Sequence, residues 1–215
     1  MGRALRSFSS MIAPELDQPD IAWCRIGNQI IFLDIANDRY FRLSEDRNCT
    51  LIESLIQNGG PQWHQPPRFP LPADWSEPAA SAKLAKEFRL GLVAKALWVQ
   101  RRIEKRIASR SLVIVLDELR DLISRRTQTL PELSAGGEAM VQAFEQAKLI
   151  RTAADRCLPR SIALAICLAS LGDRSSIVIG VRTPPFGAHC WAQKGSVVLN
   201  DSLEEVRRFE PILVV

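Results

Sequence analysis

Apolar and polar residues alternate in three short runs near the start of the chain, within the stretch IAWCRIGNQIIFLDIANDRYFRLS that begins at Ile21. Alternation with a period of two is typical of strands that bury one face. Turn-forming pairs interrupt the runs at Gly27-Asn28 and at Asn37-Asp38. The pattern therefore predicts a small antiparallel meander of three strands.

A helix and then a long loop are predicted after the third strand. Ser44 can cap the N-terminus of this helix, Glu45 and Asp46 bring negative charge into its first turn, and Gly59-Gly60 can end it. Residues 61–78 are rich in proline, which is incompatible with a helix or a central strand. We expect this segment to be irregular.

A helical pattern resumes near Ala79, where apolar residues recur at four-residue spacing. These residues are Leu84, Phe88 and Leu92. Gly91 would supply a left-handed C-cap if the helix stops there. We therefore expect a first domain over residues 19–95 and a second domain over residues 96–215.

The second domain is predicted to place helices before strands. The helical segments are 96–109, 111–126, 138–154 and 158–171. Three strand-like runs follow, SSIVIGV, AHCWAQ and SVVLN, and Lys194-Gly195 between the last two suits a two-residue hairpin turn. This order of elements indicates an α+β fold class.

Composition supports a folded globular chain. Hydrophobic residues make up 47% and charged residues 24% of the 215 positions, so a packed core can form. No stretch approaches the roughly 18 apolar residues of a membrane span, and the N-terminus has no continuous apolar segment of a signal peptide. The five cysteines are scattered and form no C-x-x-C pair, so we expect reduced thiols and a cytoplasmic location.

Positive charge is concentrated between residues 83 and 110, although the formal net charge of the chain is only +4. Aromatic residues do not alternate with these basic residues, and no nucleic-acid-binding motif is present. A solvated helix face, or a surface that binds an acidic peptide or partner protein, therefore explains the segment better than nucleic acid does. We expect neither nucleic acid nor a membrane as a partner.

Candidate chemistry centres on Cys157, which precedes the apolar segment that begins at Leu158. A thiol at the N-terminus of a helix lies near unsatisfied amides and the positive end of the helix dipole, which favour the thiolate. Pro159 supports a helix start there, because proline is tolerated in the first turn. Cys157 is therefore a candidate nucleophile.

Two further residues could complete a catalytic triad with Cys157. His189 begins a predicted strand, and Asp201 follows the next strand, so the hairpin at Lys194-Gly195 would bring imidazole and carboxylate together. A buried structural cysteine is the alternative from spacing alone. A metal site at the same three residues lacks a fourth ligand, and zinc normally takes more cysteine or histidine, so we predict no metal.

The run CLPRSIALAICLASLG, followed by IVIGVRTPPFGAHCWAQKGSVVLND, resembles the transglutaminase-like leader peptidases of lasso-peptide biosynthesis, the B proteins. The shared pattern is C-L-x-R-S, a helix ending in L-x-x-x-G, a G-V strand, P-F-x-A-H-x-W and N-D. This resemblance covers about residues 138–215 and implies a transglutaminase/papain-like cysteine protease domain. It also implies that Cys157, His189 and Asp201 are catalytic.

The N-terminal segment resembles the PqqD-like recognition domains that bind leader peptides of ribosomally made natural products. The similar stretches are IIFLDIANDRYFRLSEDRNCTLIESL and LAKEFRLGLV. The resemblance implies a winged-helix-like domain in which the leader adds a strand beside the third strand and packs on the last helix. The implied leader-binding residues are Tyr40, Phe41, Arg42, Leu43, Leu84 and Phe88. Alternatively, the apolar members of this set form the core of the domain, and Arg42 is simply solvated.

Together the two resemblances imply a fused leader peptidase, which binds the leader of a lasso precursor and hydrolyses the bond between leader and core. The freed core amine would then be closed into a ring by a partner, an ATP-dependent cyclase similar to asparagine synthetase. No G-x-x-x-x-G-K-[ST] phosphate loop occurs in this chain, so we predict no cofactor here. A transglutaminase-like acyltransferase and a non-catalytic precursor chaperone are the alternatives.

Overall fold

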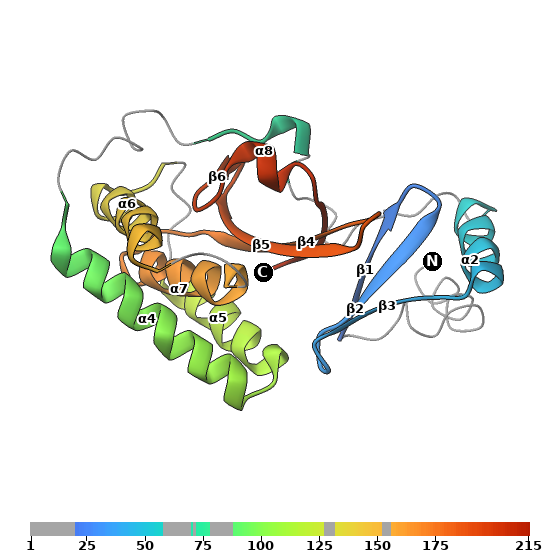
Figure 1. Cartoon of the computed structure of the whole chain (residues 1–215), viewed down its shortest axis with the longest axis horizontal. Helices are drawn as coiled ribbons and strands as arrows, with labels where there is room; N and C mark the ends of the chain where they lie inside the picture. Colours follow the sequence, from blue (N-terminus) through green and yellow to red (C-terminus); the bar gives the residue numbers. More distant parts are fainter. Residues whose placement is uncertain (1–19, 58–69, 71, 78–87, 127–131, 152–155) are drawn as a thin grey trace.

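The computed structural model describes residues 20–57, 70, 72–77, 88–126, 132–151 and 156–215. A three-stranded sheet with one helix forms one end of the molecule, and a group of helices with a four-stranded sheet forms the other (Figure 1). Both sheets are antiparallel. The structure is therefore of the mixed α+β class, as the sequence predicted.

The N-terminal sheet has the order β1-β2-β3 and is followed by one helix. The elements are β1 (Ile21–Ile26), β2 (Gln29–Asp34), β3 (Arg39–Arg42) and α2 (Glu45–Gln57). Alternate residues of β2 face opposite sides: Phe32 packs in a cluster with residues of α2, and Leu33 belongs to the core of the second half of the chain. The predicted meander and the helix after it are confirmed.

Four helices follow in the chain. They are α4 (Leu90–Ser109), α5 (Leu112–Arg126), α6 (Ala135–Ile150) and α7 (Cys157–Ser170). α7 contacts each of the other three and also the second sheet. It is apolar on nearly all sides for this reason, whereas α4 exposes a polar face.

Helix α4 differs from the sequence prediction at Gly91 and runs across the predicted domain boundary. Gly91 does not cap the end of a helix: it is the second residue of α4, which continues unbroken to Ser109. A glycine is tolerated in a first turn, and burial of Val93 and Ala96 holds the helix together beyond it. The expected boundary between residues 95 and 96 lies inside α4, and the division into two domains stays a prediction.

The second sheet has the order β6-β5-β4-β7. Its strands are β4 (Ser176–Arg182), β5 (Gly187–Lys194), β6 (Val197–Val198) and β7 (Glu210–Val214), and a short helix α8 (Leu203–Val206) precedes β7. The first two strands match the prediction, whereas β6 is shorter than expected. The structure adds β7 and α8, which the sequence pattern did not predict.

The predicted proline-rich loop is described in part. Its residues 72–77 include a short 3-10 helix, η2 (Pro72–Asp74), and Ser76 pairs with Val197 at the open side of β6. Trp75 is buried there against Trp191 of β5, with ring centroids 5.3 Å apart. This part of the loop therefore covers one face of the second sheet.

One large core joins the two halves of the described chain. It includes the inner face of the N-terminal sheet, the buried sides of the four helices and one face of the second sheet. None of the helices in the described ranges is both long and apolar enough to cross a membrane.

Candidate active site

Cys157 is the first residue of α7 and is partly exposed. The helix N-cap, Arg156, offers no side-chain hydrogen bond, and Pro159 occupies the first turn, where its missing N–H costs nothing. The backbone amide of Leu158 is hydrogen-bonded to the thiol. The helix start therefore presents the sulfur with an amide donor and with the positive end of the dipole.

His189 and Asp201 face each other beside this thiol. His189 lies on β5, Asp201 follows β6, and His189 Nε2 is 2.7 Å from Asp201 Oδ2. The other carboxylate oxygen of Asp201 accepts a hydrogen bond of 2.8 Å from the Ser202 amide. Because Nε2 faces Asp201, Nδ1 is the ring nitrogen left for the hydrogen bond between His189 and Cys157. The three predicted side chains therefore lie together, with His189 hydrogen-bonded to Asp201 on one side and to Cys157 on the other.

The pKa shifts of Cys157 and His189 favour an ion pair between these two side chains. Burial alone would raise the pKa of Cys157, but the hydrogen bond and positive charge of His189, with amides of Cys190 and Leu158, lower it below its usual 9.0. Burial would lower the pKa of His189, but hydrogen bonds to Asp201 and Cys157 and their negative charges raise it to about 9. These opposite shifts favour a thiolate paired with an imidazolium over a neutral thiol and imidazole.

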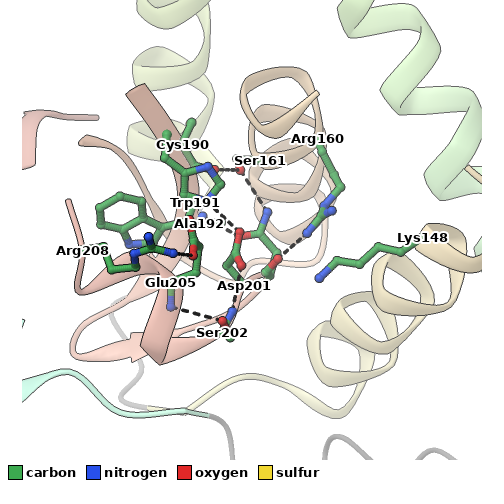
Figure 2. A network of polar contacts seen from close by, with 12 residues as sticks. Lys148, Arg160, Ser161, Cys190, Trp191, Ala192, Asp201, Ser202, Glu205 and Arg208 are labelled. Atoms are coloured by element: carbon green, nitrogen blue, oxygen red, sulfur yellow. Dashed lines mark hydrogen bonds and ion pairs between the residues drawn. The ribbon is translucent and has the colours of Figure 1, made fainter. Parts of the chain in front are cut away.

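Asp201 is suited to remain charged in this arrangement. Burial would raise its pKa, but hydrogen bonds from His189 and the Ser202 amide and the charges of His189 and Lys148 lower it below the usual value. Figure 2 shows Lys148 extending from the neighbouring helix toward Asp201. The carboxylate therefore orients the imidazole and stabilises its protonated form.

A buried hydrogen-bond network fixes the backbone around these side chains (Figure 2). The Ser161 hydroxyl on α7 donates to the carbonyl of Cys190 at 3.1 Å and accepts from Asn200 Nδ2 at 2.9 Å. Asn200 Oδ1 accepts from the Ala192 amide at 2.8 Å, and its carbonyl accepts from Arg160 of α7. The network therefore ties the helix that carries the thiol to the neighbours of His189 and Asp201.

These positioning contacts are what the sequence analysis missed. Arg160, Ser161 and Asn200 belong to the matched motif, but the pattern assigned them no role. All three are buried polar residues next to apolar neighbours. Such residues require hydrogen-bond partners, and this requirement is the signal that could have drawn attention to them.

Aromatic rings support the imidazole from the other side. The ring of His189 lies 6.1 Å from that of Trp191, nearly parallel to it, and 5.1 Å from that of Phe209. Gly180 is paired with His189 across β4 and β5, and a Cβ at Gly180 would come within 2.9 Å of both Trp191 and Phe209. The glycine therefore leaves the space in which the two rings pack beneath the histidine.

A model of the transglutaminase-like superfamily matches residues 93–214, which is more than half of the chain. The chain belongs to the transglutaminase-like superfamily. Members of this superfamily are generally cysteine peptidases or acyltransferases, so the matched domain indicates a function of one of these two kinds. Searches of curated proteins and of solved structures found no match.

The pKa of Cys157 in this transglutaminase-like domain is shifted in the opposite direction from those of the three buried thiols of the described chain. Burial raises the pKa of Cys167, and burial together with the negative charge of Cys157 raises that of Cys190. In the N-terminal sheet, burial and the charge of Glu210 raise the pKa of Cys24. These three remain neutral thiols, whereas Cys157 is placed to react.

The predicted leader-binding residues are not gathered into one site. Phe41 stacks on Phe32 with centroids 5.0 Å apart and faces α2, where Leu43 also packs. Tyr40 faces the opposite side and packs against the large core. Arg42 is exposed and donates to Gln29 Oε1 at 3.1 Å. Phe88, just before α4, is half exposed, and Leu84 lies outside the described residues.

Among the residues that the structure describes, no group of three or more His, Cys, Asp or Glu side chains is arranged to hold a metal ion. The contacts within the transglutaminase-like site are those of a hydrogen-bonded thiol, imidazole and carboxylate. The arrangement is suited to nucleophilic attack by sulfur on an acyl group.

Proposed function

We propose that this protein is the leader peptidase of lasso-peptide biosynthesis, which hydrolyses the bond between leader and core of a precursor peptide. The observation that carries the proposal is the alignment of Cys157, His189 and Asp201, with the 2.7 Å contact between the last two. The motif around these residues supports the choice of a peptide substrate, and the family supports cysteine-dependent acyl chemistry.

The reaction starts with attack of the Cys157 thiolate on the carbonyl carbon of the last leader residue. His189 then gives its proton to the nitrogen of the core peptide, which leaves as a free amine while the leader stays on sulfur as a thioester. Neutral His189 next takes a proton from water, the hydroxide attacks the thioester, and the leader departs with a free carboxylate. Amides at the start of α7 are candidates to bind the oxyanion in both steps.

Leader recognition is assigned to the N-terminal sheet. β3 is an edge strand in the order β1-β2-β3, and no other strand of the described residues pairs with its outer side, where an extended peptide could add. A leader bound in this way would add a fourth strand, with affinity from main-chain hydrogen bonds. Arg42 of β3 is exposed and is available for side-chain contacts with such a peptide.

The core peptide released by cleavage would be the substrate of the expected partner enzyme. Cleavage frees the α-amine of the core peptide, and closing it into an amide ring requires activation of a carboxylate, a reaction that consumes ATP. We assign that step to the cyclase similar to asparagine synthetase. The present chain would supply its substrate.

The test is incubation of the whole protein with a candidate precursor, with and without the cyclase, followed by mass spectrometry. We expect free leader and core masses from the wild type and none from Cys157→Ala, while Cys167→Ala retains cleavage because Cys167 is buried away from the site. Cleavage by Cys157→Ala would disprove the mechanism.

The same experiment separates the two alternatives. A leader joined to an added amine, in place of free leader, would identify an acyltransferase. Bound but intact precursor under all conditions would identify a non-catalytic chaperone. Either result would overturn the peptidase assignment.

A further inference from the structure

Two aromatic side chains from distant parts of the chain meet at the turn that leads into β5, the strand that carries His189. Tyr40 of β3 and Phe186 of the β4–β5 turn contact each other, with ring centroids 5.4 Å apart and planes inclined by 58°. Figure 1 shows the tip of the β4–β5 hairpin reaching the N-terminal sheet. Phe186 is close in sequence to His189, so this contact links the recognition sheet to the catalytic strand.

The orientation of Tyr40 follows from strand register. Tyr40 is paired with Leu33, whose side chain belongs to the large core, so both point toward the helices and the second sheet. Tyr40 and Cys157 both pack at the margin of this core. Phe41, one position later, faces α2 instead.

Electrostatics agree with this position. Burial raises the pKa of the Tyr40 hydroxyl above its usual range, and the negative charges of Asp38 and Cys157 raise it further. Cys157 therefore lies near enough to Tyr40 for its charge to act on the hydroxyl, although the two residues are far apart in the sequence.

Exposure distinguishes this pair from an ordinary core contact. Phe186 is 50% exposed, and Tyr40 and Cys157 are each partly exposed. A partly exposed aromatic pair offers a large rigid apolar surface at low entropic cost. An apolar side chain of a bound peptide would bury this surface.

We propose that Tyr40 and Phe186 form a subsite that binds an apolar side chain next to the scissile bond. A peptide that pairs with the edge of β3 would enter the catalytic centre past this subsite. The inference rests on the proposed function, because it takes the ligand to be the peptide that Cys157 attacks. It assigns to the N-terminal sheet a direct part in substrate selection at the catalytic centre.

The test compares the rates at which N-benzyl iodoacetamide and iodoacetamide alkylate Cys157. The rates are measured from the mass of the peptide that contains Cys157. We expect the wild type to react faster with the benzyl reagent, because its ring packs against the exposed surface that Tyr40 and Phe186 form together. Phe186→Ala should reduce this preference by roughly five- to tenfold, as loss of an aromatic pair does. Tyr40→Ala should reduce it similarly, and Tyr40→Phe should keep it.

Trp98→Ala is the matched control, since Trp98 is an exposed aromatic residue on α4. It should leave the preference unchanged. An unchanged preference in Phe186→Ala would overturn the subsite, and that variant is safe for folding because the side chain lies half exposed in a turn. Alkylation does not depend on cleavage, so a retained preference without precursor cleavage would refute the peptidase assignment and leave the subsite standing.

Discussion

His189 Nε2 and Asp201 Oδ2 lie 2.7 Å apart, at the ends of a hairpin whose two strands bring imidazole and carboxylate to the same side. The contact leaves the other ring nitrogen to the thiol of Cys157. It also helps to raise the pKa of His189 to about 9. The carboxylate thereby influences the protonation of a sulfur that it does not touch.

Asp201→Asn tests this relationship. The amide has no charge to stabilise the imidazolium, so the pKa of His189 should fall and kcat/KM for precursor cleavage should drop by roughly 10³-fold or more. Steady-state kinetics with the precursor measure the loss. Glu204→Gln, a nearby exposed carboxylate on α8, should retain full activity, and equal losses in both variants would contradict the assignment.

The pH dependence of two assays should differ on the alkaline side. Cys157 has a pKa below 9.0, so alkylation by iodoacetamide should decline only as pH falls through that lowered pKa. Cleavage needs protonated His189 as well, so it should also decline as pH rises through about 9. Rates of both reactions measured from pH 4 to 11 check the prediction, and cleavage that keeps rising above the pKa of His189 would count against it.

Ser161→Ala should destabilise the protein. Removing the hydroxyl leaves the Cys190 carbonyl and Asn200 Nδ2 without their partner in a buried site, at a cost of about 2–4 kcal/mol in free energy of unfolding. Ser170→Ala on the same helix should change this free energy by less than about 0.5 kcal/mol, because Ser170 is exposed. Urea unfolding measures the free energy of unfolding of both variants. Equal values would show that the Ser161 hydrogen bonds do not stabilise the fold.

Gly180→Ala should weaken the support of His189. The added methyl group would come within 2.9 Å of Trp191 and Phe209, and such overpacking costs about 1–3 kcal/mol in free energy of unfolding. Gly91→Ala should have the opposite sign and stabilise by about 0.5–1 kcal/mol, since nothing lies near its Cβ position in the first turn of α4. Thermal unfolding compares the two, and a neutral Gly180→Ala would show that the rings have room to move.

Much of the fold could be predicted because its signals are local. The period-two runs from Ile21 and the apolar segment of α7 carry their own patterns, and the chemistry of Cys157 follows from its place at a helix start. The structure brings Cys157, His189 and Asp201 together, and their catalytic roles stay a prediction that the variants above test.

The remainder depends on contacts between distant segments. β7 is short and contains Pro211, so its sequence does not predict a strand. It forms at the edge of the sheet, where a proline is tolerated, through pairing with β4. The approach of Tyr40 to Phe186 likewise arises only when the two sheets meet. No periodicity along the chain encodes either contact.

The shared core bears on whether binding and catalysis can be separated by dividing the polypeptide. Leu33 of the N-terminal sheet and Leu213 of β7 belong to one buried cluster, and a cut at residue 95 would also sever the first turns of α4. Each fragment would expose apolar surface that only the other can cover. A split version of this protein would therefore require both fragments to be produced together and to reassociate, and neither fragment alone would be expected to fold into a working unit.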